Sequence, residues 1–337
     1  MKKIFIIILT CISIIMMWSN TANACSDFKL SYQNNIIVGH NVDWGQKQGF
    51  IVLSKRGLIH KSMPISGASP ISWEAKYGSI TFTLSKPDGT PNRSAVVAGM
   101  NEQGLVAAIL WLDESSYPPP SNDRKILPST QWAQYMLDNA GCVQDVIELS
   151  KKIQIASAAY AGKTILVHLI VHDAKNQSAV LEYTNGKLNI YTGNELPLPI
   201  ITNSNYPKSL EEFNRYKNKK VTELPGGYWT LARFVLGSNY ISNLKLSSSQ
   251  QLMPLGFNLL GYLVEPPLGD EPTNWSIVFD ITHKKIYYRD IDNPTIREIS
   301  MNILDTLKNN EYKACNIMSN SCFRTKTSFL NNDTPSR

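Results

Sequence analysis

The most sustained apolar segment of the chain lies at its start. Two lysines precede an apolar run over residues 4–18, and a short polar segment then leads to the sequence Ala-Asn-Ala-Cys, which ends at Cys25. A basic start, an apolar centre and small residues before the cleavage point are typical of a secretory signal peptide. The pattern predicts cleavage after Ala24. We therefore expect residues 1–24 to be a signal peptide, the protein to be exported to the periplasm or secreted, and Cys25 to begin the mature chain.

Downstream of Cys25, groups of strand-like segments alternate with groups of helix-like segments. Apolar runs of four to eight residues bounded by turn signals predict strands, and apolar residues three or four apart predict helices. The predicted strands cover residues 28–32, 36–38, 50–53, 79–84, 94–98, 106–112, 166–171, 179–183, 188–191, 276–280 and 285–288. The predicted helices cover residues 128–153, as two helices separated at Gly141, and 207–216, 230–236 and 248–263. This order predicts an α+β fold in which two sheets pack together with helices outside.

Composition sets the limits of the folded unit. Hydrophobic residues make up 43% of the chain and charged residues 18%, which is typical of a globular protein with a substantial core. We expect one domain over residues 25–308 and a loosely held polar tail over residues 309–337, which are rich in Ser, Asn and Thr. No apolar run after Cys25 is long enough to span a membrane. Loss of two lysines with the signal lowers the formal net charge from +6 to +4, and no basic block indicates nucleic-acid binding.

Four cysteines remain after the predicted cleavage: Cys25, Cys142, Cys315 and Cys322. An exported protein meets oxidising conditions, and Cys315 and Cys322 are close enough in sequence to close a small loop by a disulfide. Cys142 lies in a helix-like segment and is expected to be a buried thiol. This pairing leaves Cys25 free. No Cys or His spacing predicts a metal site.

A mature chain that starts at Cys25 would carry an α-amine and a thiol on one residue. An amine beside a nucleophile can act as its general base, so this arrangement indicates an amide hydrolase with an N-terminal nucleophile. The residues leave three other interpretations open. Cys25 could be lipidated, although lipoprotein signals usually have Leu where this chain has Ala22; it could form a disulfide; or it could be a small buried residue.

Five short motifs follow in a fixed order. They are Cys25, Asp43-Trp44, Gly-Met-Asn-Glu-Gln-Gly-Leu at residues 99–105, Thr202-Asn203-Ser204, and Leu-Pro-Gly-Gly-Tyr-Trp-Thr-Leu-Ala-Arg-Phe at residues 224–234. Together they resemble the choloylglycine hydrolase family of penicillin V acylases and conjugated bile salt hydrolases, and most of all the Gram-negative penicillin V acylase type. The resemblance runs from Cys25 to about Tyr288. It implies a four-layer αββα Ntn-hydrolase sandwich, with two antiparallel sheets between helix layers, and hydrolysis of a linear amide through a thioester, with no cofactor or metal.

The resemblance also implies roles for four residues. Cys25 would be the nucleophile, with its α-amine as the proton acceptor. Asp43 would lie close to that amine and thiol and favour the protonated amine. Asn203 would donate from its side-chain amide to the oxyanion, and Arg233 would supply a permanent positive charge that stabilises thiolate and oxyanion.

The sequence departs from the family pattern at two positions. His40 stands three residues before the aspartate, where the family usually has an arginine lining the nucleophile, and a shifted alignment would place Asn41 there instead. The charge of a histidine depends on pH, so we expect an altered pH profile if His40 takes that place. Trp111 stands where the family usually has Asn or Tyr in the oxyanion hole. Its ring N–H could still donate, but its apolar surface indicates an acyl pocket shared with Trp44.

Two tryptophans flanking a cleft suit an aryl or fatty acyl chain better than a rigid steroid. The expected partner is therefore a small N-acyl amide, such as a penicillin V-like compound or an N-acyl homoserine lactone, rather than a conjugated bile salt. An acyltransferase that uses the same thioester and a non-catalytic acyl-binding lipoprotein are the alternatives. The resemblance also implies a possible homotetramer.

Overall fold

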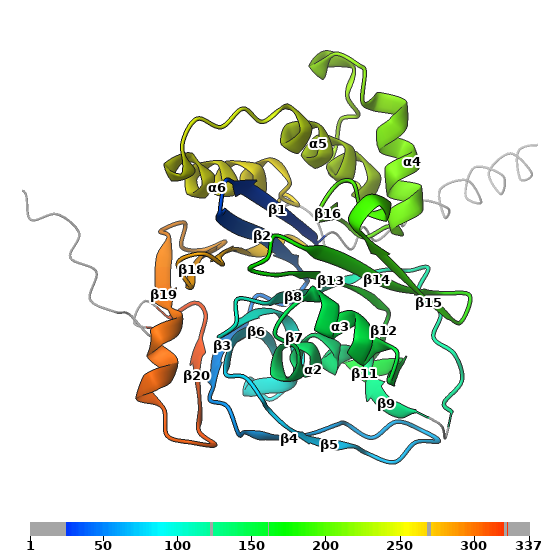
Figure 1. Cartoon of the computed structure of the whole chain (residues 1–337), viewed down its shortest axis with the longest axis vertical. Helices are drawn as coiled ribbons and strands as arrows, with labels where there is room; N and C mark the ends of the chain where they lie inside the picture. The colour runs from blue at the N-terminus through cyan, green and yellow to red at the C-terminus, as the bar shows by residue number, and fades with distance from the viewer. Residues whose placement is uncertain (1–24, 122–123, 161, 268–270, 320–321, 323–337) are drawn as a thin grey trace, which may run out of the picture.

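The computed structural model describes residues 25–121, 124–160, 162–267, 271–319 and 322. Residues 1–24, predicted as the signal peptide, lie outside the described residues, as do residues 323–337 of the predicted tail. Two large antiparallel sheets form the centre of the molecule (Figure 1). The six-stranded sheet has the order β16 (Ile200–Ile201), β1 (Ser26–Tyr32), β2 (Asn35–Asp43), β17 (Thr273–Asp280), β18 (Lys285–Asp290), β19 (Arg297–Ser300).

The eight-stranded sheet packs against the first. Its order is β15 (Lys187–Thr192), β14 (Ser178–Thr184), β13 (Val167–His172), β8 (Val106–Trp111), β7 (Pro91–Asn101), β6 (Ser79–Ser85), β3 (Gly49–Ser54), β20 (Tyr312–Asn316). Rings from the two sheets meet in the core, where Phe82 of β6 packs edge-on against Phe279 of β17. Three small two-stranded sheets lie outside: β4 (Ile59–Lys61) with β5 (Ser72–Glu74), β9 (Lys125–Pro128) with β10 (Ile153–Ala156), and β11 (Ala158–Tyr160) with β12 (Lys163–Ile165).

Helices cover the outer faces of both sheets (Figure 1). On the six-stranded sheet these are α5 (Thr230–Asn243) and α6 (Leu252–Tyr262), and α4 (Tyr206–Tyr216) packs against α5. On the other side, α2 (Trp132–Asn139) packs on β7 and β8, and α3 (Val143–Ser150) lies beside it. Short 3₁₀ turns connect the elements: η1 (Ser129–Gln131), η2 (Gly193–Glu195), η3 (Val221–Glu223), η4 (Ser249–Gln251) and η5 (Met301–Thr306). The layers confirm the predicted αββα sandwich.

Local sequence explains why several of these elements form where they do. The side chain of Asn205 caps α4 by accepting a hydrogen bond from the backbone N–H of Lys208, and Pro207 stands in its first turn. Asn185 and Gly186 both have positive φ and form the predicted hairpin turn between β14 and β15. Gly237 lets α5 approach the sheet closely, since a Cβ there would lie 2.3 Å from Ile200.

Two predicted boundaries need correction. The strand predicted over residues 36–38 continues to Asp43, because β2 pairs along its length with both β1 and β17. The polar tail predicted from residue 309 is not loosely held at its start, because β20 pairs with β3 at the edge of the eight-stranded sheet. The predicted disulfide between Cys315 and Cys322 is present and follows that strand, while Cys25 and Cys142 are free thiols.

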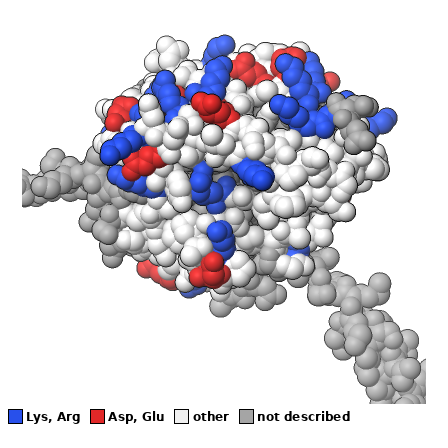
Figure 2. Space-filling view, turned by 90° about the horizontal axis from the view of Figure 1, so that it is seen from below, with Lys and Arg blue, Asp and Glu red and all other residues white. Residues whose placement is uncertain are grey.

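The charged surface shows no single-sign band on the face that Figure 2 presents. Lys and Arg side chains lie there among Asp and Glu side chains, with uncharged surface between them (Figure 2). In the described part of the chain, no helix is both long and apolar enough to cross a membrane.

Candidate active site

Cys25 lies at the start of β1, where the six-stranded sheet brings it beside the end of β2. The antiparallel register pairs Ser26 with Asn41, so Cys25 comes beside the last two residues of β2, Val42 and Asp43. Its Sγ accepts a hydrogen bond from the backbone N–H of Asp43 at 3.5 Å and lies 3.6 Å from the Asp43 carbonyl oxygen. Strand pairing therefore fixes the distance between the thiol and the aspartate, two residues that are eighteen positions apart in the sequence.

Arg233 joins the other predicted site residues into one buried cluster. From α5, its guanidinium donates to the carbonyl of Cys25 at 3.3 Å, to the Asp43 carboxylate at 3.2 Å and to Oδ1 of Asn203 at 3.3 Å. Its Nε donates to the carbonyl of Tyr228 at 2.9 Å, which sets the direction of the side chain. Arg233 and Asp43 are each only 1% exposed. The structure thus brings together Cys25, Asp43, Asn203 and Arg233, which we call the catalytic cluster.

The orientation of Asn203 is set from both ends of its amide. Its oxygen accepts from Arg233, and its nitrogen donates to the carbonyl of Trp111 at 2.8 Å. An amide nitrogen carries two N–H groups, so one remains for an oxyanion. Trp111 does not play the donor role considered from the sequence, because its ring N–H donates to Asp113 at 2.5 Å. The indole N–H is therefore not a donor for the oxyanion hole, and Trp111 contributes its carbonyl and its apolar surface.

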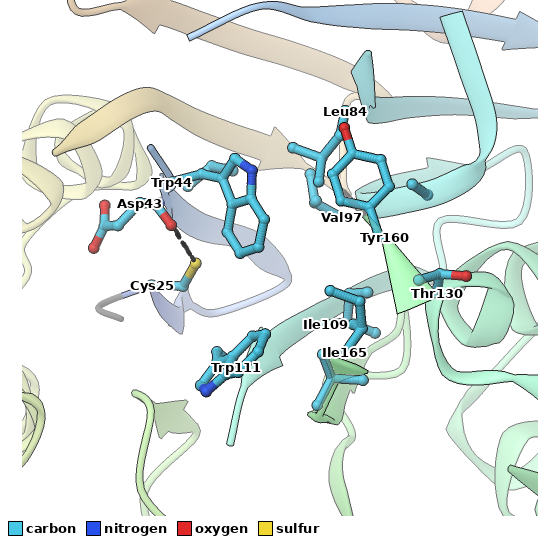
Figure 3. A pocket seen from close by; sticks show the side chains of 13 residues that line it. Cys25, Asp43, Trp44, Leu84, Val97, Ile109, Trp111, Thr130, Tyr160 and Ile165 are labelled. Atoms are coloured by element: carbon cyan, nitrogen blue, oxygen red, sulfur yellow. Dashed lines mark hydrogen bonds between the residues drawn. The ribbon is translucent and has the colours of Figure 1, made fainter. Parts of the chain in front are cut away.

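An apolar pocket opens beside Cys25 (Figure 3). Its empty volume, including the opening to solvent, is about 560 Å³. Trp44 and Trp111 flank the thiol with ring centroids 6.3 Å apart and tilted by 43°, which confirms the predicted pairing of the two tryptophans. The deeper wall comes from several strands and consists of Leu84, Ala95, Val97, Ile109, Thr130, Tyr160, Ile165 and Val167.

His40 is not part of this pocket, which corrects the prediction that it lines the nucleophile. Residues three apart on a strand point to opposite faces, so His40 and Asp43 of β2 diverge. The Nδ1 of His40 lies 3.0 Å from the carboxylate of Asp27, and His172 of the opposite sheet approaches the same carboxylate at 2.9 Å. His40 is fully buried between the sheets. Asn41, the alternative, faces the helix layer and donates to the carbonyl of Leu260.

Thr273 is a site residue that the sequence motifs do not reveal. At the first position of β17, its hydroxyl donates to the Asp43 carboxylate at 2.5 Å and accepts from the backbone N–H of Glu265 at 2.8 Å. No short motif marks Thr273, since it precedes the predicted strand by three residues. Tyr160 was also missed, because no strand was predicted between residues 153 and 166, where the β11–β12 hairpin forms.

Burial dominates the electrostatics of the catalytic cluster. Burial raises the pKa of Asp43 to about 7, against the opposing effects of Arg233 and the Thr273 hydroxyl. Burial, together with the nearby Asp43 charge, raises the pKa of the Cys25 thiol to about 12. In this continuous chain, where Cys25 is still joined to Ala24, the thiol is therefore protonated at neutral pH, and it needs a base to become a nucleophile.

A metal site does not form among the residues that the structure describes, where no three His, Cys, Asp or Glu side chains come together in a suitable arrangement. The chemistry that the cluster can support is that of a thiol, an amide donor, a guanidinium and a carboxylate at the mouth of an apolar pocket.

Comparisons with family models, curated proteins and solved structures all indicate the same family. The family model of the linear amide C-N hydrolases, choloylglycine hydrolase family, matches residues 25–241. The penicillin V acylase of Pectobacterium atrosepticum is 28% identical over 66% of this chain, and the alignment covers 65% of that protein. The structure of penicillin V acylase from Agrobacterium tumefaciens superposes with a TM-score of 0.73 at 26% identity, covering 86% of this chain and 90% of that one.

A second solved structure supports the fold alone. A single-residue variant of conjugated bile acid hydrolase from Clostridium perfringens superposes with a TM-score of 0.70 at 18% identity, covering 90% of this chain and 100% of that one. The family match begins at Cys25 and includes every residue of the catalytic cluster. The resemblance seen in the ordered motifs is thereby confirmed: this chain, which spans a little under two thirds of the curated relatives it matches, belongs to the choloylglycine hydrolase family of linear amide C-N hydrolases.

Proposed function

We propose that the protein is exported, that cleavage after Ala24 makes Cys25 its first residue, and that it hydrolyses N-acyl amides with an apolar aryl or fatty acyl group. The observation that carries this proposal is the position of the Cys25 thiol. It lies at the mouth of an apolar pocket and within one hydrogen-bonded cluster with Asp43, Asn203 and Arg233.

Cleavage would supply the base that the thiol lacks. The new α-amine of Cys25 takes the thiol proton, and Sγ attacks the carbonyl carbon of the amide. The free N–H of Asn203 donates to the resulting oxyanion, an interaction worth about 2.7–4 kcal/mol in the transition state when a comparable donor is removed. The C–N bond then breaks, and the leaving amine takes the proton from the α-ammonium. A thioester on Cys25 remains.

Water completes the cycle. The α-amine accepts a proton as water attacks the thioester carbonyl, and that proton returns to Sγ when the carboxylic acid leaves. Ionised Asp43 favours the protonated amine formed in both steps. Arg233 holds Asp43 and Asn203 in place and adds a fixed positive charge near the oxyanion.

The shape of the pocket supports an apolar acyl group. Its walls are almost wholly apolar, and the two tryptophan rings define a cleft suited to a flat ring or a linear chain. Phenoxyacetyl amides such as penicillin V and N-acyl homoserine lactones meet this requirement. A rigid steroid fits it less well.

The test joins mass spectrometry to a substrate panel. The intact mass and N-terminal sequence of the exported protein should show a chain that begins at unmodified Cys25. That protein should release amine from phenoxyacetyl and fatty acyl amides, and Cys25→Ala should release none while its thermal unfolding stays unchanged. A lipid adduct on Cys25, or turnover by Cys25→Ala, would rule out this mechanism.

A further inference from the structure

A second cavity lies away from the acyl pocket and shares no lining residue with it. It opens between the β1 edge of the six-stranded sheet, the β13–β14 turn and helix α3, and its empty volume, open solvent included, is about 930 Å³. Lys29 of β1 reaches it from between the sheets, and Ile147, Leu196 and Pro199 supply apolar wall. The cavity thus combines one cation with apolar surface.

Lys29 is an unusual residue for its position. It follows Asp27 on the inward face of β1 and is only 8% exposed. Lysine is almost never buried to this extent unless a carboxylate pairs with it. Its Nζ donates to the carbonyl of Asn176 at 2.6 Å, and no carboxylate in the described ranges forms an ion pair with it. Two of the three N–H groups of the ammonium therefore have no protein acceptor in this part of the chain.

Asp173, the carboxylate that acts on the charge of Lys29, already accepts backbone hydrogen bonds on both of its oxygens. Asp173 accepts backbone N–H groups from Lys175 and Gln177 on one oxygen and from Val143 on the other. It closes the β13–β14 turn and takes the first backbone N–H of α3, that of Val143. Burial lowers the pKa of Lys29 only to about 8, with Asp173 opposing the shift, so the amine is still mainly protonated at neutral pH.

We infer that this cavity binds a monocarboxylate with an apolar tail, its carboxylate on Lys29 and its tail along Ile147 and Leu196. A single cation suits one carboxylate better than a phosphate with several charges. The acid released by the proposed hydrolysis is such a molecule. Its identification as the ligand rests on the proposed function, whereas the site itself does not.

The site also has a physical connection to the nucleophile. Lys29 is four residues after Cys25 on the same strand, and Asp27 lies between them. Ser178, which lines the cavity, bonds His172, which in turn contacts Asp27. Lys29 therefore places the site on the strand that directly follows Cys25, and the hydrogen bonds from Ser178 through His172 reach Asp27 on that same strand.

The test measures how many molecules of octanoate bind, by equilibrium dialysis with the Cys25→Ala protein. Lys29→Met should remove one equivalent of bound octanoate, or weaken its binding at least tenfold. Ile147→Trp, which fills the cavity from α3 and keeps Lys29, should remove the same equivalent. Lys313→Met, at an exposed lysine on β20, is the matched control and should change nothing. Octanamide, which has the same length and no charge, should not occupy the site.

Equal stoichiometry in Cys25→Ala and both cavity variants would overturn the inference. Because binding is measured without turnover, failure of the proposed hydrolysis would leave a different signature. Octanoate would still bind in a Lys29-dependent manner, and only the identification of the natural ligand as a reaction product would be wrong.

Discussion

Neighbouring strands β1 and β2 each carry one fully buried carboxylate, and the two behave in opposite ways. Asp43 lies in the catalytic cluster, and burial raises its pKa to about 7 despite its contact with Arg233. Asp27 lies between the sheets, where His40 and His172 donate to its two oxygens; we call these three residues the inter-sheet clamp. Burial would raise the pKa of Asp27, but the hydrogen bonds from His172 and His40 prevail and lower it.

The surroundings of the two carboxylates explain why their pKa values shift in opposite directions. Burial also lowers the pKa of His172, and its second nitrogen accepts from the Ser178 hydroxyl, which is the arrangement of a neutral ring. The lowered pKa of Asp27 therefore keeps this carboxylate charged through the neutral range. Asp43 faces a thiol and a pocket, and it changes charge close to neutral pH, where a catalytic group is most useful. Changes to the catalytic cluster should affect turnover, and changes to the inter-sheet clamp should affect stability.

The largest effect is expected from Asn203→Ala, which removes the oxyanion donor from the catalytic cluster. kcat should fall about 10²–10³-fold, because the negative charge of the tetrahedral intermediate loses a preorganised donor. KM should change little, since the donor acts mainly in the transition state. Steady-state kinetics on an N-acyl amide measure this.

Asn205→Ala is the matched control for that prediction. Asn205 is two residues away and caps α4, so its loss should cost about 1 kcal/mol of stability and leave kcat unchanged. Equal losses of kcat in the two variants would show that the Asn203 effect is only structural.

The catalytic cluster could be found from the sequence because each member belongs to a motif with a fixed place in the chain. The ordered set of motifs resembles the choloylglycine hydrolase family, and this resemblance assigned roles to Asn203 and Arg233 that a strand end or a helix alone would not have assigned. The two-sheet fold followed from the grouping of strands and helices. Thr273 could not be found in this way, because its contact with Asp43 depends on how β17 pairs with β2.

His40 was assigned to the site wrongly for a related reason. It was placed there because it stands three residues before Asp43, where the resembled family usually has an arginine that lines the nucleophile. Because β2 continues to Asp43, strict alternation along the strand sends His40 to the inter-sheet face. Position in a motif thus did not determine which face of the strand the side chain occupies.

The second largest effect is expected from Asp27→Asn in the inter-sheet clamp. The free energy of unfolding should fall by about 1.5–3 kcal/mol, since a buried charged acceptor of two hydrogen bonds is lost. The pH dependence should change as well. The folded pKa of Asp27 lies below its unfolded value near 4, so its stabilisation is present above about pH 4 and is lost as the pH falls further. The variant should lack that acid loss in urea unfolding from about pH 2.5 to 8.

Asp43→Asn should change the pH dependence of the free energy of unfolding in the opposite direction to Asp27→Asn. The folded pKa of Asp43, about 7, lies above its unfolded value, so the folded state binds an extra proton between about pH 4 and 7. Stability therefore falls as the pH rises through that range, and the variant should remove this fall. If both variants changed the same pH window, the contrast between the two carboxylates would be wrong.

A smaller effect is expected from Thr273→Val, which keeps the shape of the side chain and removes its hydroxyl. The Asp43 carboxylate loses a donor, so its pKa should rise further, by about one unit if the bond is worth about 1.4 kcal/mol. The acid limb of the kcat profile should then move to higher pH, and turnover at about pH 6 should fall about tenfold. Thr273→Ser keeps the donor and should keep the profile. A uniform loss of kcat at all pH values would mean that Thr273 acts only on folding.

The smallest effect on activity is expected from His40→Asn, and it tests the reassignment of His40 directly. The amide nitrogen of Asn can take the place of Nδ1 as donor to Asp27, so one hydrogen bond of the clamp survives while ring packing is lost. Stability should fall by about 1 kcal/mol, within the usual range for a single substitution. kcat should change less than about threefold, and the pH profile should keep its shape, because the imidazole faces the opposite sheet and not the thiol. A kcat profile that changed shape with pH in this variant would instead place His40 at the nucleophile.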